Sequence, residues 1–180
     1  MAWSAPMTAV ANATFTAAQF NQYVRDNLNE TAPAKATSAG SYFVADGVNS
    51  IAERTSAGST VLTSQTTTST SFTDLTTVGP TITVETGPMA LLFSHCQLSN
   101  SGVGQSYAGV EVSGASSIAP ALNRSINIDN AAGVVIGAGT GVIYEGGIVL
   151  APGSNTFTMK YRVSSGTGTF ADRRLFVVPL

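Results

Sequence analysis

His95 and Cys96 are the only histidine and the only cysteine of the 180-residue chain, and side by side they suggest a nucleophile with its base. Adjacent residues of a strand point to opposite faces, so on a strand the two side chains diverge. One His and one Cys do not complete a tetrahedral metal shell. We therefore expect His95 in a core or at an interface, with a metal shared by three copies of His95 as an alternative. We expect Cys96 to be a buried, inert thiol without a disulfide partner.

Carboxylates are the next groups that could do chemistry. A glycoside hydrolase needs two of them at a defined separation, and such an enzyme would normally carry more aromatic and acidic residues. The candidates are spread through the predicted β-region: Glu85, Glu111, Asp129, Glu145 and Asp172. We expect no catalytic residue, no metal and no cofactor. The enzyme alternative requires that Glu111→Ala or Glu145→Ala abolish an activity.

A glycine-rich run, Gly137-Ala-Gly-Thr-Gly141, follows the apolar residues Val134-Val-Ile136 and superficially resembles a strand that enters a phosphate-binding loop. The dinucleotide fingerprint needs a helix next, whose N-terminus holds the pyrophosphate. Here residues 142–147 have the pattern of another strand. The run is therefore predicted to be a β-turn.

Asp172, Arg173 and Arg174 precede the last apolar run of the chain. Alternation sends one arginine outward and the other toward the sheet interior or a subunit boundary, where it needs a carboxylate partner. An ion pair between subunits is one interpretation, and two solvated turn charges are the other.

Composition narrows the class of function. Charged residues make up 10% of the chain, against roughly 25% in an ordinary soluble domain, which favours a protein that hides surface in an assembly. The formal charge of -2 and the scattered Lys and Arg residues argue against nucleic-acid binding. We find no signal peptide and no membrane span, and we expect folding in a cytoplasm.

The N-terminal region is predicted to be an extended arm over residues 1–15, followed by a helix. Thr16 and Gln19 fit a capping box at the start of this helix, and Pro33 should end it. Apolar side chains form one stripe on the helix, which is too short to be stable alone and must pack against something. With two residues of the arm, the stripe makes a predicted anchor and oligomer interface: Trp3, Phe15, Phe20, Tyr23, Val24 and Leu28.

From residue 60 onward, β-branched residues and turn signals dominate. The clearest alternation is 156–163, in which Phe157, Met159, Tyr161 and Val163 share one face. Other predicted strands lie at 89–99, 107–113, 125–128, 142–150 and 170–178. We expect a mainly β chain with two parts: an arm, helix and small irregular or hairpin-bearing collar at 1–58, and an antiparallel, jelly-roll-like sandwich of about eight strands at 59–180.

The stretch from Phe15 to Leu28, FTAAQFNQYVRDNL, preceded by Trp3, resembles the opening of structural proteins of tailed bacteriophages, particularly minor tail and fibre-like proteins of phages that infect actinobacteria. Residues 112–116, 150–157 and 173–180 look like the terminal β-domain of such proteins. The resemblance implies a homotrimeric head, attachment to capsid or tail proteins through residues 1–58, and assembly into a virion in the host cytoplasm.

Three functions follow as expectations. The first is a non-enzymatic, minor tail or fibre-like component of the virion. The second is a capsid-decorating head-fibre protein, because the chain is short and lacks long fibre repeats. The third, of another class, is a module that binds a host surface glycan, for which Tyr107 and Tyr144 are the candidate stacking residues.

Overall fold

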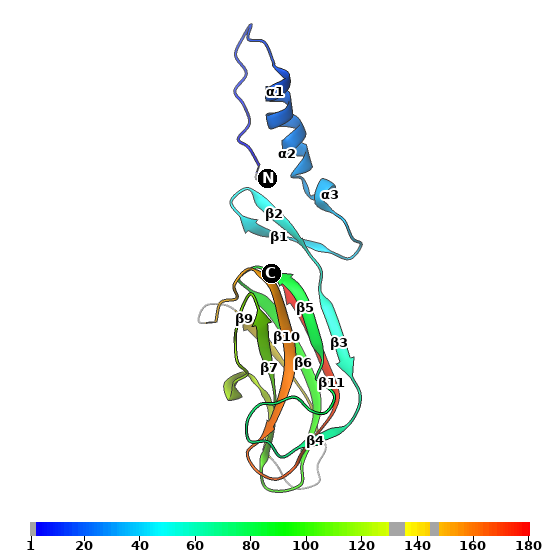
Figure 1. Cartoon of the computed structure of the whole chain (residues 1–180). Coiled ribbons are helices and arrows are strands. Elements are labelled where there is room, and N and C mark those ends of the chain that lie inside the picture. Colours follow the sequence, from blue (N-terminus) through cyan, green and yellow to red (C-terminus); the bar gives the residue numbers. More distant parts are fainter. Residues whose placement is uncertain (1–2, 130–135, 145–147) are drawn as a thin grey trace. The chain divides into compact units, whose positions relative to one another are not determined.

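The computed structural model describes residues 3–129, 136–144 and 148–180, with backbone alone at most positions of 136–144. The chain divides into two compact units, Met1–Thr55 and Ser56–Leu180 (Figure 1). The division expected at 58/59 lies within strand β3 (Ala57–Val61), and residues 56–58 belong to the second unit.

The first unit contains a continuous helical run: α1 (Ala17–Phe20), a π-helical turn η1 (Asn21–Arg25) and α2 (Asp26–Asn29). The predicted capping box is confirmed, because the Gln19 N–H donates to Thr16 Oγ1 at 3.2 Å and the Thr16 N–H donates to Gln19 Oε1 at 2.9 Å. The prediction that Pro33 ends this helix is wrong. Pro33 lies in the first turn of a separate short helix, α3 (Ala32–Lys35), where its missing N–H costs no helical hydrogen bond.

A hairpin of β1 (Tyr42–Gly47) and β2 (Ser50–Arg54) completes the first unit, so the predicted collar takes its hairpin-bearing form. Lys35 joins α3 to this hairpin, because its Nζ donates to the Ile51 carbonyl at 2.8 Å and pairs with Glu30 at 2.7 Å. The Glu53 carboxylate accepts hydrogen bonds from the Thr37 and Ser38 amides, at 3.0 Å each, and from the Ser41 and Thr37 hydroxyls. It thereby closes the 36–41 loop onto β2.

The second unit is a sandwich of two antiparallel sheets. One has the order β5-β10-β7-β8 and the other β3-β11-β6-β9, with β4 also paired to β11. The remaining strands are β4 (Gln65–Thr67), β5 (Thr81–Thr86), β6 (Ala90–Asn100), β7 (Gln105–Gly114), β8 (Ile126–Asp129), β9 (Ile136–Tyr144), β10 (Gly153–Val163) and β11 (Gly168–Pro179), and a 3₁₀ turn η2 (Leu122–Arg124) precedes β8.

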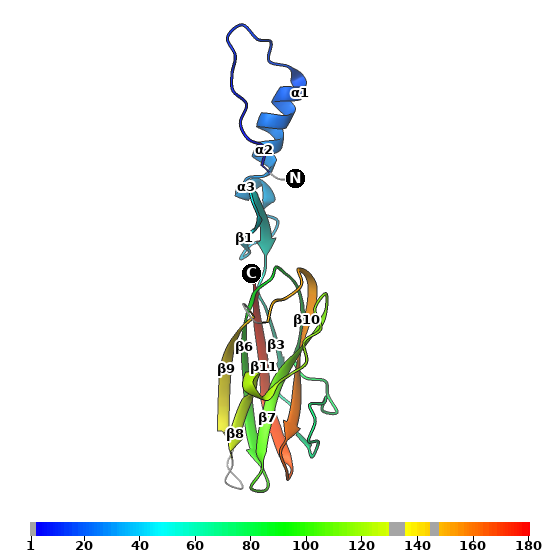
Figure 2. The ribbon, with the colours of Figure 1, turned by 90° about the vertical axis from the view of Figure 1, so that its left-hand side faces the viewer.

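The pairing follows one long hairpin that is rolled up. Strand β7 pairs with β8 at the tip of this hairpin, and moving outward β6 pairs with β9, β5 with β10, and β3 and β4 together with β11 (Figure 1 and Figure 2). Rolling this hairpin brings β11 beside β6 and β10 beside β7, which closes the two sheets. In the described residues, the eight strand positions and this order are those of a jelly roll, as the sequence predicted.

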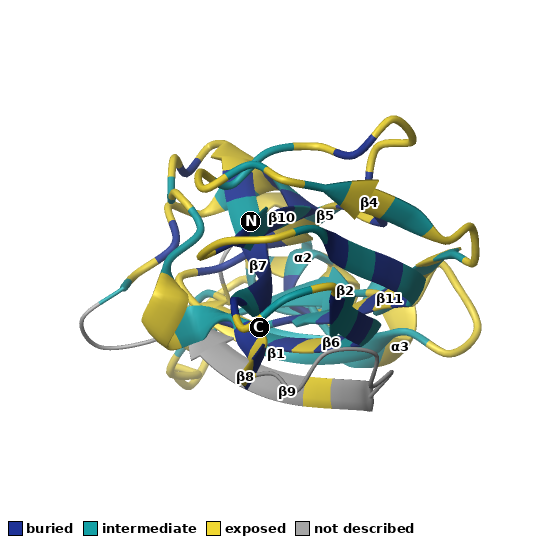
Figure 3. Cartoon of the chain, turned by 90° about the horizontal axis from the view of Figure 1, so that it is seen from below, coloured by how far each residue is buried: buried dark blue, intermediate teal, exposed yellow. Residues whose placement is uncertain are grey.

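The core lies between the two sheets, where buried positions alternate with exposed ones along the strands (Figure 3). The predicted inward set on β10 is confirmed, since Phe157, Met159, Tyr161 and Val163 are fully buried. Leu92 and Leu98 of β6 and Leu175 of β11 face them from the other sheet. The alternation of apolar and polar residues along β10 was therefore enough to predict which of its side chains form the core.

One strand differs from its prediction. Residues 137–141 were predicted to be a glycine-rich turn, with a strand at 142–150, but strand β9 spans Ile136–Tyr144 and pairs with β6 along its whole length. Nine residues of ladder pairing override the weak strand propensity of glycine. The phosphate-loop alternative fails as well, because no helix follows Gly141 directly: the strand continues to Tyr144.

Candidate functional site

The predicted anchor residues lie in the first unit, where the side chain of Asn27 holds the arm to the helix. The Ser4 N–H donates to Asn27 Oδ1 at 2.9 Å, and Asn27 Nδ2 donates to the Ser4 carbonyl at 3.0 Å and to the Tyr23 carbonyl at 3.1 Å. The Trp3 N–H donates to the Asn49 carbonyl at 3.0 Å. The backbone of the arm is therefore held at two residues: Ser4 is bound to the Asn27 side chain of α2, and Trp3 is bound to the hairpin turn at Asn49.

Sequence reasoning missed Asn27. Its position four residues after Tyr23 places it on the same helical face as the apolar stripe, and that spacing was a signal that a polar residue on this face has a specific partner. It is the one residue in the described part of the first unit that is buried.

The apolar anchor residues themselves are largely uncovered. Leu28 is 60% exposed, Phe15 53% and Phe20 49%, while Tyr23 and Val24 are half-buried and Trp3 is exposed. The rings of Phe15 and Phe20 meet edge to face with centroids 6.1 Å apart, which joins the arm to α1. Met7, Val10 and Phe15 also line an open groove beside Gln19. Within the described residues of this unit, no apolar side chain is fully buried.

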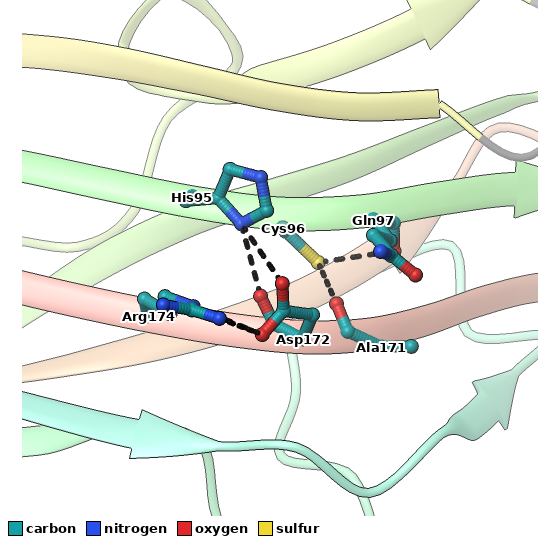
Figure 4. A network of polar contacts seen from close by, with 6 residues as sticks. All are labelled: His95, Cys96, Gln97, Ala171, Asp172 and Arg174. Atoms are coloured by element: carbon teal, nitrogen blue, oxygen red, sulfur yellow. Dashed lines mark hydrogen bonds and ion pairs between the residues drawn. The ribbon is translucent and has the colours of Figure 1, made fainter.

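In the second unit, Asp172 lies at a bulge of β11, where the pairing with β6 shifts between Ala171 and Arg174. Its φ of 45° is in the left-handed region that few non-glycine residues adopt. The bulge places Arg173 inward and Arg174 outward. The Arg174 guanidinium pairs with the Asp172 carboxylate of the same chain, with an Nε–Oδ1 distance of 2.9 Å (Figure 4).

Arg173 is fully buried, and its partners are carbonyl oxygens where a carboxylate was expected. One terminal nitrogen donates to Thr63 O at 3.1 Å and to Gln65 Oε1 at 3.3 Å, and the other donates to Thr77 O at 3.4 Å. The guanidinium also lies 5.4 Å from the centre of the Tyr161 ring. Arg173 therefore ties the 63–77 segment to β11, a role that the sequence did not reveal.

His95 and Cys96 diverge, as predicted (Figure 4). His95 Nδ1 lies 3.0 Å from the Asp172 carbonyl and 3.9 Å from Asp172 Oδ2, on the partly exposed side of β6. The Cys96 thiol is buried on the other side and donates to the carbonyls of Gln97 and Ala171. Burial raises the pKa of Cys96 to about 12, so the thiol is not a nucleophile at neutral pH.

Two of the candidate carboxylates, Glu85 and Glu111, are too far apart to be the pair that a glycosidase needs. Glu85 is opposite Ser154 and Glu111 is opposite Thr158, so they are about 13 Å apart along the strand direction alone, whereas a hydrolytic pair is separated by roughly 5–9.5 Å. Asp172 belongs to the other sheet, and Glu145 lies outside the described residues.

Glu111 has a different partner, Lys160, which lies between two carboxylates. The distances are 2.7 Å from Lys160 Nζ to Asp74 and 3.2 Å to Glu111. Desolvation lowers the pKa of Lys160, but the hydrogen bonds to these carboxylates outweigh it and the net pKa is raised. Asp74, which sequence reasoning missed, thereby fastens the 72–74 segment onto β10. In the part of the chain that the structure describes, no group of three metal-ligating side chains occurs.

The residues proposed for glycan stacking are not available as an exposed pair. Tyr107 is 8% exposed and lies 5.5 Å beneath the Arg162 guanidinium. The side chain of Tyr144 lies outside the described residues.

Comparison with known proteins adds no identification, because no protein-family model and no curated protein matches this chain. Among the described residues, no helix is both long enough and apolar enough to cross a membrane.

Proposed function

We propose that this chain is a non-enzymatic structural protein of a bacteriophage virion, attached through its first unit and displaying a trimeric β-head, most simply as a minor tail or fibre-like component. The observation that carries the proposal is the uncovered apolar surface of the first unit, formed by Phe15, Phe20 and Leu28. A helix of this length that fully buries no apolar side chain gains little from its own chain. A partner surface that covers these residues would supply the missing burial.

The second unit supports a display role. It has a continuous core and its own closed topology, so it does not depend on the first unit for burial. Its low charge suits a domain that shares surface with other copies in an assembly. Among the described residues, the Cys96 thiol is inert at neutral pH, and Glu111 and Asp172 are held in ion pairs with Lys160 and Arg174, which fits a structural role.

The test is incorporation into particles. Phage particles are assembled with the wild-type chain, with Phe20→Asp or with Leu28→Asp, and the bound protein is quantified after purification. Each aspartate should reduce incorporation at least tenfold, because it buries an unpaired charge in the attachment surface. Gln22→Asp, an exposed position of the same helical run, is the matched control and should be incorporated normally. Normal incorporation of both variants would reject the anchor.

Location separates this proposal from its nearest alternative. Cryo-electron microscopy of the particles would place the head density at the tail for a minor tail component and at the capsomers for a decoration protein. A host glycan receptor is the further alternative, and binding of the purified chain to host surface glycans would support it.

A further inference from the structure

We infer that the outer face of the β3-β11-β6-β9 sheet is the surface through which copies of this chain associate. We call it the phenylalanine face, and it consists of Leu91, Phe93, His95, Arg174, Phe176 and Val178, bordered by Gly58 and Gly139. The inference rests on the trimer in the proposed function and specifies the surface that would form it.

Two phenylalanines dominate this face. Phe93 of β6 and Phe176 of β11 are directly opposite each other in the strand register, and they are 51% and 43% exposed. Among the described residues, they are the only large apolar side chains that are exposed on strands of the second unit. Leu91 and Val178, also paired across β6 and β11, are half-buried and extend the apolar surface by one step. Aromatic residues at the centre of a patch are typical of association surfaces.

The outer face of the other sheet is different. Its central strand β10 presents Thr156, Lys160 and Arg162, and these have partners within the chain: Thr83 for Thr156, Asp74 and Glu111 for Lys160, and the Phe72 and Tyr107 rings for Arg162. The polar side chains that β10 presents on this outer face therefore have partners within their own chain, whereas Phe93 and Phe176 on the phenylalanine face remain exposed. Among the described strand residues of the second unit, the large apolar side chains left exposed are those of the phenylalanine face.

Glycines flank the two phenylalanines on both sides. Gly58 of β3 is opposite Phe176, and the β9 residues opposite Phe93 and His95 are Gly141 and Gly139. Glycine in a strand interior often marks a bulge, a bend or a site where a ligand or another backbone approaches closely. The space over Gly58 is taken by the Phe176 ring of the same chain, because a Cβ at Gly58 would lie 3.3 Å from Phe176 Cδ2. An open groove runs along this face between Gly58, Thr60, Phe93 and Arg174. The face thus combines the two exposed rings of Phe93 and Phe176 with a low margin at Gly139 and Gly141 of β9, which a second copy of this chain can cover.

Charge on this face is balanced, so identical copies can meet without repulsion. Arg174 and Asp172 of the same chain pair at 2.8 Å, and His95 lies beside them, with Nδ1 3.0 Å from the Asp172 carbonyl. A contact between Phe93 and Phe176 of one copy and the margin of the next copy is a head-to-tail contact, which closes into a ring when the rotation is a third of a turn. In such a ring, the Phe93 and Phe176 side chains of the three copies lie around a threefold axis.

Sedimentation velocity of the full chain tests the inference. The wild type should sediment as a trimer, and Phe93→Glu and Phe176→Glu should each sediment as a monomer, a threefold fall in mass. Thr83→Glu, an exposed position on the outer face of the other sheet, should remain a trimer. Trimeric Phe93→Glu and Phe176→Glu would overturn the inference and leave the proposed function standing. A monomeric wild type would also overturn it, whereas the attachment role is judged separately by incorporation of Phe20→Asp and Leu28→Asp.

A second measurement keeps the inference testable if the glutamate variants fail to fold. Phe93→Trp preserves the aromatic side chain and adds one indole to a chain whose single tryptophan is Trp3. The added emission should be protected from acrylamide, because the phenylalanine face is covered in the trimer. Quenching as strong as that of a free indole would show that the face is uncovered and would reject the inference.

Discussion

The two units of this chain differ in how far they bury their apolar side chains. The second unit encloses an uninterrupted core between two sheets, with Phe157, Tyr161, Leu92 and Leu98 fully buried. In the described part of the first unit, the one buried residue is polar Asn27. Since apolar burial is the main favourable term in folding, the second unit carries its own stability and the first is held by hydrogen bonds and by whatever covers it.

The largest expected effect is in the core of the second unit. Phe157→Ala should lower the free energy of unfolding by about 3–5 kcal/mol, through lost burial and the cavity left behind. Phe20→Ala in the first unit should change the unfolding of the second unit by less than about 0.5 kcal/mol. Urea unfolding followed by circular dichroism measures both. Equal losses from the two substitutions would show that the units share one cooperative core.

The next effect concerns the buried guanidinium. Arg173→Ala should cost about 1–3 kcal/mol, because the carbonyls of Thr63 and Thr77 lose their donors. Arg174→Ala is the matched control, since its exposed pair with Asp172 contributes at most about 1 kcal/mol. Amide exchange in the 63–77 segment should accelerate in the Arg173 variant alone. A loss confined to Arg174→Ala would contradict the roles assigned here.

Arg173 and Arg174 also show what can be predicted from a sequence pattern and what cannot. Alternation predicted one inward and one outward arginine, and period-two spacing predicted the inward set of β10, because both follow from backbone geometry that operates within one strand. The carbonyl partners of Arg173 come from a segment about a hundred residues earlier in the chain. No local pattern encodes such a contact. The sequence therefore predicted a carboxylate partner for Arg173, whereas the structure has carbonyl oxygens.

The same limit applies to β9 and to the candidate sites. Local propensity predicted a turn at residues 137–141, whereas pairing with β6 makes them part of a strand. The capping box at Thr16 was predictable because both partners lie within one turn. The phenylalanine face was not, since Phe93 and Phe176 become neighbours only when β6 and β11 pair.

A smaller effect is expected at Asn27. Asn27→Ala removes the hydrogen bonds to both backbone groups of Ser4, so the arm should separate from α2 while the helix persists. Proteolysis within residues 5–15 should become faster, with no change in the unfolding of the second unit. Asn29→Ala, an exposed position in the same turn, is the control. An arm that stays protected in Asn27→Ala would mean that other contacts hold it.

The smallest effect is a pH dependence confined to the first unit. Hydrogen bonds from Ser41, Thr37 and Ser38 lower the pKa of Glu53 from 4.5 to about 2. Because the folded-state pKa is depressed, the contribution of this carboxylate is present above pH 4.5 and is lost as the pH falls toward 2. Exchange of the Thr37 and Ser38 amides should therefore show extra acceleration across this window, and Glu53→Gln should remove that pH dependence. The second unit should not respond, because the hydrogen-bond partners of Glu53 lie within the first unit. A response of both units at the same pH would show that the loop is coupled to the sandwich and that the two units do not unfold independently.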